Sequence, residues 1–116
     1  MATITATQAV FDNNPGLLVT WTPLANGDTG NAMQTGAWRD ASVQVQGTFG
    51  TGGSVTFQGS NDGTNWFALT DPQGNAITKT AAALEQISEI SRYVRPNVTA
   101  GDGTTALTVI VFAGRS

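Results

Sequence analysis

The sequence predicts an all-β protein: an antiparallel β-sandwich of jelly-roll type with eight or nine short strands and at most one short helix. Two observations lead to this fold class. Turn-forming Gly, Asn, Asp and Pro recur about every eight to twelve residues, and the segments between them alternate apolar with polar residues or are rich in β-branched ones. No internal repeat divides the chain. We therefore expect one sandwich domain over residues 17–116, preceded over residues 1–16 by an N-terminal arm or edge strand.

The first third of the chain holds one weak and one strong strand candidate before a long irregular stretch. Residues 3–10 alternate weakly, and the turn-forming run 12–16 ends them. Residues 17–22 (LLVTWT) form a convincing short strand that stops at Pro23. Residues 24–36 (LANGDTGNAMQTG) have no periodicity and predict a long loop, a kind of segment that is often functional.

Alternation is clean in the middle of the chain. Residues 41–49 and 55–59 place Val and Phe on one face and Ser, Thr and Gln on the other. Asp62-Gly63 then predicts a type I′ hairpin turn, in which both central residues need positive φ. Residues 65–70 (NWFALT) are the expected return strand.

The last third contains one ambiguous segment and two strands. Residues 81–90 have helical propensity and near-helical apolar spacing, but they lie in an otherwise β sequence, so we expect extended structure after a loop. Residues 93–99 alternate, and Pro96, which has no N–H to donate, predicts a sheet edge or a bulge there. Residues 106–113 (ALTVIVFA) are continuously apolar or β-branched and predict a strand buried on both sides.

Composition narrows the classes of partner. Charged residues make up 11% of the chain, against about 25% in an average soluble domain, so either Thr, Asn and Gln coat the surface or much of it faces other protein. The net charge is −3, and the five basic residues are scattered, which argues against nucleic-acid binding. No apolar run approaches the roughly 20 residues of a membrane span, and the first residues lack the pattern of a signal peptide. We therefore expect synthesis in the cytoplasm of the producing cell and no membrane partner.

The sequence lacks several of the side chains that catalytic sites use most often. The chain has no His and no Cys, which removes the commonest general base, the thiolate nucleophile and the usual zinc ligands. Calcium is the ion that Asn61, Asp62 and Asn65 could hold most readily, but their spacing is not that of an EF-hand, and turn capping accounts for them. The same capping role is expected for Asp12, Asp71 and Asp102. We expect no enzyme, no cofactor and no metal site.

Trp and Arg residues are the candidates for partner contact, because these types are enriched at the energetic centres of interfaces. Trp38 and Arg39 lie beside the long loop, and Trp21 ends a strand where it could face either the core or a partner. Arg92 and Arg95 flank Tyr93-Val94 and could pair with surface acids or with a carboxylate-bearing partner. Trp66 is expected to pack in the core under the hairpin. The partner-contact candidates are Trp21, Trp38, Arg39, Arg92 and Arg95.

A family resemblance adds a possible role. The pairing of GSVTFQGSNDGTNWFAL with SRYVRPNVTAGDGTTALTVIVFA resembles small structural proteins of tailed bacteriophages, which include capsid decoration, or cement, proteins with β-sandwich and jelly-roll folds. The residues that carry the resemblance are 47–49, 55–59, 60–66, 93–96 and 107–113. The hairpin and the R-Y-V-R strand also look like those of discoidin-type sugar- or lipid-binding modules, but this chain is shorter and lacks their cysteines. Residues 1–39 match neither family.

The phage resemblance implies a protein that binds the outer surface of an assembled icosahedral shell and stiffens it. Its partner would be the lattice of the major capsid protein. It would be synthesised in the host cytoplasm and would reside on the virion exterior. It would form a homo-oligomer, either a dimer or a trimer. Lattice contacts are expected in residues 1–15 and 24–39, with Trp38 as an anchor. The alternatives are a carbohydrate-binding module of a phage fibre and a structural subunit of the tail or neck.

Overall fold

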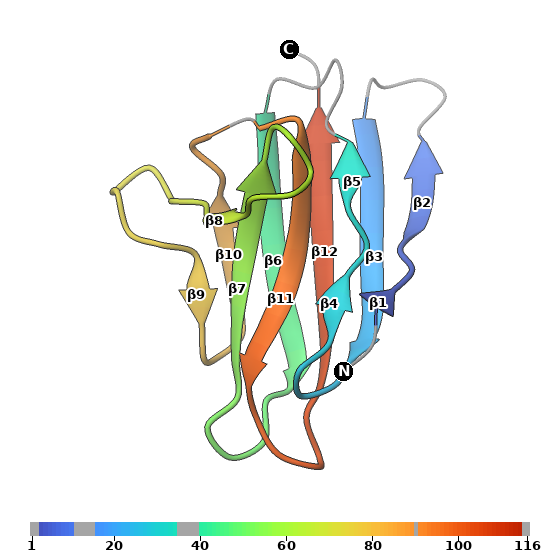
Figure 1. Cartoon of the computed structure of the whole chain (residues 1–116), viewed down its shortest axis with the longest axis vertical. Coiled ribbons are helices and arrows are strands. Elements are labelled where there is room, and N and C mark those ends of the chain that lie inside the picture. The colour runs from blue at the N-terminus through green and yellow to red at the C-terminus, as the bar shows by residue number, and fades with distance from the viewer. Residues whose placement is uncertain (1–2, 11–15, 35–39, 90, 115–116) are drawn as a thin grey trace.

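The computed structural model describes residues 3–10, 16–34, 40–89 and 91–114. These residues form two β-sheets packed face to face, so the predicted all-β sandwich is confirmed (Figure 1). The described residues contain twelve strands, more than the eight or nine expected, because five of them are pieces of two residues. Within this described part, no helix is long and apolar enough to cross a membrane.

Sheet B is the regular layer of the sandwich. Its strand order is β10 (Ala83–Gln86), β6 (Asp40–Thr48), β12 (Ala106–Gly114), β3 (Gly16–Leu24) and β2 (Thr7–Val10). All four neighbouring pairs are antiparallel. The extended structure expected within 81–90 is confirmed over β10, and residue 90 lies outside the described residues. Three nine-residue strands at the centre make sheet B a nearly continuous ladder.

Sheet A is built around two long strands, with short pieces on either side. The long strands are β7 (Ser54–Ser60) and β11 (Tyr93–Ala100), which pair antiparallel with each other. The two-residue pieces are β1 (Thr3–Ile4) and β4 (Thr29–Gly30), then β5 (Met33–Gln34), β8 (Phe67–Ala68) and β9 (Thr78–Lys79). Pieces β4 and β5 pair with β11, whereas β8 and β9 pair with β7. The N-terminal segment contributes to both sheets, since β1 lies at an edge of sheet A and β2 at an edge of sheet B.

The predicted long loop over 24–36 is wrong for its described residues, because β4 and β5 pair there with β11. Asn31 between them replaces the missing ladder with side-chain hydrogen bonds. Its Oδ1 accepts from the backbone N of Ala6 at 2.9 Å and from Nε1 of Trp21 at 3.0 Å, and its backbone N donates to the Ile4 carbonyl at 2.8 Å. A polar, Gly-rich segment is thereby held in the sheet without any hydrophobic periodicity.

Pro96 lies inside sheet A and not at its edge, so the edge-strand prediction is wrong. It is paired with Phe57, whose own N–H and C=O bond to Ile77 and Leu69 on the far side of β7. The other side of Pro96 faces the break between β4 and β5, where Gly30 passes so closely that a Cβ built there would lie 2.6 Å from Cδ of Pro96. The missing N–H therefore removes no ladder bond, and a bulge follows between Val98 and Ala100.

The core lies between the two sheets and is filled by alternate side chains from both. Trp21 is its largest member, 0% exposed, and its ring meets that of Phe57 edge-on at 6.2 Å between centroids. Strand β12 follows the same alternation: Leu107, Val109 and Val111 are buried, whereas Phe112 is 41% exposed. The prediction that residues 106–113 are buried on both sides is therefore wrong, because no described segment covers the outer side of sheet B.

Candidate interaction surfaces

The loop after β7 is organised by the carboxylate of Asp62. Its Oδ1 accepts hydrogen bonds from Oγ of Ser60 and from the backbone N–H groups of Thr64 and Asn65 at 2.8 to 2.9 Å, and its Oδ2 accepts from Nδ2 of Asn65 at 2.9 Å. These donors, the Asn65 N–H foremost, hold the pKa of Asp62 well below its usual range. The expected two-residue type I′ turn is wrong, because no described residue other than glycine has positive φ. The chain instead forms a wider loop before the short β8.

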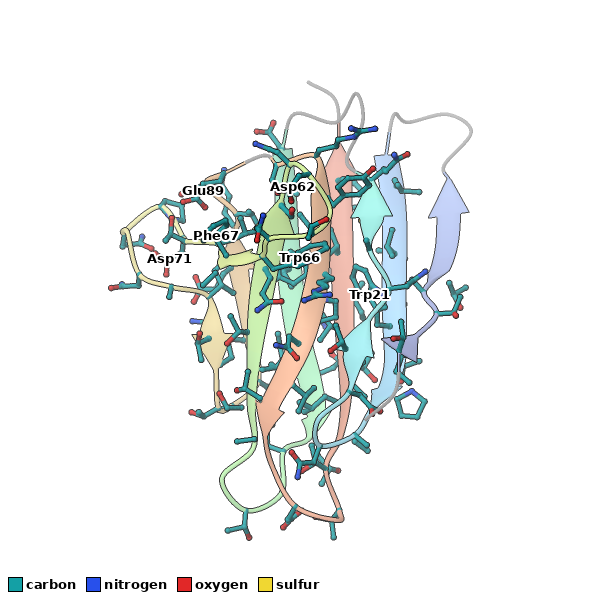
Figure 2. All side chains as sticks on the ribbon, in the orientation of Figure 1. Trp21, Asp62, Trp66, Phe67, Asp71 and Glu89 are labelled. Carbon is teal, nitrogen blue, oxygen red and sulfur yellow. The ribbon has the colours of Figure 1, made fainter. Side chains whose placement is uncertain are left out.

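An aromatic and arginine cluster, formed by Trp66, Arg95, Tyr93 and Arg92, lies over the outer face of sheet A. Cζ of Arg95 lies 4.0 Å from the ring centroid of Trp66, and Cζ of Arg92 lies 5.1 Å from that of Tyr93. Nε of Arg95 also donates to Oε1 of Gln58 at 3.0 Å, and burial lowers the pKa of its guanidinium. Trp66 is half-buried in front of this sheet, so its predicted place in the core is wrong (Figure 2).

Beside this cluster the edge of sheet A opens into a cavity of about 500 Å³ between the Asp62 loop, β8, Glu89 and Ser91. Phe67 of β8 lines it with a side chain that is 71% exposed. Glu89 lines the cavity as well, and its two carboxylate oxygens accept from the backbone N and Oγ1 of Thr70. These bonds, that of the Thr70 hydroxyl first, lower the pKa of Glu89. Figure 2 places Phe67 and Glu89 on the same side of the molecule.

The outer face of sheet B has a different character. By alternation and strand register it consists of Leu18, Thr20, Thr22, Ser42, Gln44, Gln46, Leu84, Gln86, Thr108, Ile110 and Phe112. None of these side chains carries a charge, and Asp40 lies at the end of the face. Leu84 is 66% and Phe112 41% exposed. We call this set the sheet B outer face.

The predicted partner-contact residues are distributed unevenly. The prediction that Trp21 contacts a partner is wrong, because its side chain is fully buried. Its Nε1 donates to the carbonyl and to Oδ1 of Asn31 at 3.1 and 3.0 Å. Trp38 and Arg39 lie outside the described residues. Arg92 and Arg95 come together on the outer face of sheet A, each stacked on an aromatic ring.

Sequence reasoning missed Phe67, Leu84 and Phe112, the large apolar residues that the described surface exposes most. A signal for Phe112 was present. It alternates with Val109, Val111 and Ala113, so that a strand with one buried face leaves it outside. Phe67 gave no such signal, because the expected return strand over 65–70 is reduced to the two residues of β8.

The remaining turn carboxylates behave as predicted. Asp102 accepts from the backbone N–H groups of Thr51 and Thr104 at 2.8 and 2.9 Å, and Asp71 accepts from those of Gln73 and Asn75 at 3.0 Å. Asp12 lies outside the described residues. Among the residues that are described, no three His, Cys, Asp or Glu side chains gather as a metal site would require.

No protein-family model matches the sequence, and no curated protein is a significant sequence relative. The chain is similar in fold to the SPBc2 prophage-derived protein YomS, with a TM-score of 0.63 and 14% identity over 84% of this chain and 93% of that one. KdgF from Halomonas sp. is less similar, with a TM-score of 0.43 and 13% identity over 96% of this chain and 78% of that one. The likeness to YomS supports the sandwich fold.

Proposed function

We propose that this protein is a structural component of a tailed-phage virion that binds the assembled capsid surface and stabilises it, as a decoration or cement protein. It would be made in the host cytoplasm, reside on the capsid exterior and act without catalysis or cofactor. Two independent likenesses support a phage origin: the sequence resemblance of residues 47–113 to small virion proteins, and the shared fold with a prophage-derived protein.

The sheet B outer face is the observation that carries the proposal. Its four strands are three of nine residues and one of four; at about 4.8 Å between strands and about 3.3 Å per residue they give a face of roughly 500 Å². This is more than half of the area of about 800 Å² that one partner of a standard protein interface contributes. Because the face holds only aliphatic, aromatic, Thr, Ser and Gln side chains, burying it desolvates no charge. The exposed Leu84 and Phe112 supply the apolar area that favours association.

The stabilising mechanism is mass action. A ligand that binds the assembled lattice and not the free subunits stabilises the lattice by RT ln(1 + [L]/Kd). Contact with two neighbouring capsid subunits, or assembly of this protein into a dimer or trimer, would raise the apparent affinity through multivalency. The expected lattice contacts in residues 1–15 and 24–39 belong to the same proposal.

The decisive experiment mixes purified protein with phage heads that lack it, and measures binding by sedimentation and head rupture on heating. We expect wild-type protein to bind and to raise the rupture temperature. A variant with Leu84→Glu and Phe112→Glu should fold but bind at least about 30-fold more weakly, the effect of losing a contact worth 2 kcal/mol.

The matched control places the same two charges on sheet A, as Thr78→Glu with Thr99→Glu, both at exposed positions. It should bind heads like wild type. Wild-type protein that fails to bind heads, or binds them without raising the rupture temperature, would overturn the proposal. Ring-shaped oligomers in solution would instead favour a tail or neck subunit.

A further inference from the structure

The cavity beside Phe67 is open to solvent and lies away from the sheet B outer face. It opens at the edge of sheet A, where β8 is only two residues long and Phe67 is paired with Gly59. The floor at Gly59 is tightly packed: a Cβ built there would lie 2.4 Å from Oγ of Ser91 and 2.6 Å from Cδ2 of Leu69. Ser91 and Leu69 therefore pack directly against Gly59 at the bottom of the cavity.

The Phe67 ring gives this hollow one apolar wall. At 71% exposure it has the highest exposed fraction among the large apolar side chains described. An aromatic ring has an electron-rich face, which attracts weakly positive C–H groups. The axial C–H groups on one face of a pyranose ring are of this kind, so a sugar can lie flat against the phenyl ring.

Polar groups of fixed orientation form the other walls. Asp62 is held by hydrogen bonds from its own loop, and Glu89 by hydrogen bonds from the backbone N and Oγ1 of Thr70. Oδ2 of Asp62 and the two carboxylate oxygens of Glu89 accept one of these bonds each, so each has a second acceptor position for a ligand hydroxyl. Asn61 is fixed too, since its Oδ1 accepts from the backbone N of Arg92 at 2.9 Å and its NH₂ group is left to donate. Groups that are already ordered bind a hydroxylated ligand without the entropic loss of immobilising flexible side chains.

The charge of the lining selects among ligands. Asp62 and Glu89 line the cavity, whereas Arg92 and Arg95 lie beside it and outside its described lining, so a neutral ligand is favoured over an anionic one. A cavity of about 500 Å³ lies within the range of small-molecule sites. We propose that it binds a neutral pyranose, as a free sugar or as the terminal residue of a surface glycan. This goes beyond capsid binding and does not depend on it.

The test is a ¹H–¹⁵N shift titration of the full chain with the methyl glycosides of glucose, galactose, mannose and N-acetylglucosamine. We expect at least one glycoside to bind with a Kd of about 1 mM, shifting the backbone amides of Asn61, Phe67 and Ser91. Phe67→Trp should keep this binding. Phe67→Leu, which keeps apolar bulk but lacks the ring, should weaken it at least about tenfold. Thr78→Ala, outside the cavity lining, is the off-site control.

Three results would overturn the proposal. One is that no glycoside shifts these amides at up to about 50 mM. Another is that the shifts persist unchanged in Phe67→Leu. The third is that glucuronate binds as well as glucose, which would contradict the selection against anions. Because the titration contains no phage heads, its failure leaves the head-binding experiment untouched, and Phe67→Leu is expected to bind heads normally.

Discussion

Sheets A and B enclose one core but present very different outer surfaces. Sheet B has three nine-residue strands at its centre, and its outer face is a flat array of uncharged side chains. Sheet A has two long strands, and its neighbours are two-residue pieces separated by loops (Figure 1). Over it lie the arginine and aromatic cluster and, at its edge, the cavity beside Phe67.

The difference follows from how each sheet satisfies its backbone hydrogen-bonding groups. A continuous ladder satisfies its backbone groups internally and leaves only alternating side chains to face outward, which suits broad docking. An interrupted sheet must satisfy its backbone groups with side chains such as Asn31, Asp62 and Glu89. Those same polar groups, once fixed, are what a small ligand needs.

The largest expected effect on stability comes from adding a side chain at Gly30, which packs closely against Trp21 and Pro96. In Gly30→Ala, the new Cβ would lie 2.6 Å from both Cδ of Pro96 and Cδ1 of Trp21, so the Trp21 ring or strand β11 must move. Overpacking of this kind costs about 1 to 3 kcal/mol of unfolding free energy. Urea denaturation followed by Trp fluorescence measures it.

The matched control is Gly103→Ala, because a Cβ built at Gly103 meets no atom within 4 Å. Its unfolding free energy should stay within about 0.5 kcal/mol of wild type. Equal losses in the two variants would mean that the close approach of Gly30 to Trp21 and Pro96 does not determine how sheet A is built.

The two sheets also differ in how far the sequence predicts them. The alternation of residues 41–49 and the β-branched run 106–113 identified the central strands of sheet B, because a half-buried ladder imposes a period of two. Over 24–34 no such period exists, since Asn31 and the contact of Gly30 with Pro96 hold that segment through partners remote in sequence. The turn carboxylates were predictable because most of their partners are two to four residues away, whereas the bond between Asp102 and the remote Thr51 was not.

The candidate site was predicted only in part for the same reason. Arg92 and Arg95 were singled out by residue type, and both lie on sheet A. The exposure of Trp66 and Phe67 was not predicted, because the Asp-Gly pair indicated a two-residue turn and a full return strand, whereas the structure has a wider loop and the two-residue β8. The sheet B outer face was not predicted from the sequence. The apolar run 106–113 indicated a strand buried on both sides, whereas one side of that strand faces away from the core.

Acid should destabilise the protein through its turn carboxylates, and more through Asp102 than through Asp62. Both have a folded pKa below the ordinary value of about 3.9, Asp102 chiefly through the Thr104 hydroxyl. The ionised forms therefore stabilise the fold above about pH 4, and this contribution is lost as the pH falls below that. Asp102 also links two turns that connect the sheets, through Thr51, whereas the Asp62 bonds stay within one loop.

The measurement is the unfolding free energy between pH 2 and 7 for wild type, Asp102→Asn and Asp62→Asn. The wild-type curve should fall below about pH 4. Asp102→Asn should be less stable than wild type at pH 7, and its stability should fall less steeply in acid. Asp62→Asn should lie between wild type and Asp102→Asn in both respects. An acid limb unchanged by either substitution would contradict the assignment.

A smaller effect is expected from the arginine stack on sheet A. Arg95→Met keeps most of the apolar stem but removes the charge over Trp66 and the bond to Gln58, and should lose about 0.5 to 1 kcal/mol of unfolding free energy. Arg95→Lys retains charge without the planar guanidinium and should recover only part of the loss. If Arg95→Met matches wild type while the Trp66 indole resonance is also unshifted, the stack contributes nothing to sheet A.

The smallest effect concerns the one ion pair seen among the described residues, which joins the two sheets. Nζ of Lys79 in β9 lies 2.6 Å from Oε2 of Glu85 in β10, so the pair bridges the edges of sheets A and B where only short strands meet. Both side chains are partly exposed, and such pairs contribute about 0.2 to 1 kcal/mol. A double-mutant cycle with Lys79→Met and Glu85→Gln isolates the coupling, which should shrink as salt is raised to about 1 M. A coupling near zero at low salt would mean that the buried Ile77 and Ile87 and the hydrogen bonds of Thr70 with Ser88 and Glu89 hold the sheets together at this edge without help from the ion pair.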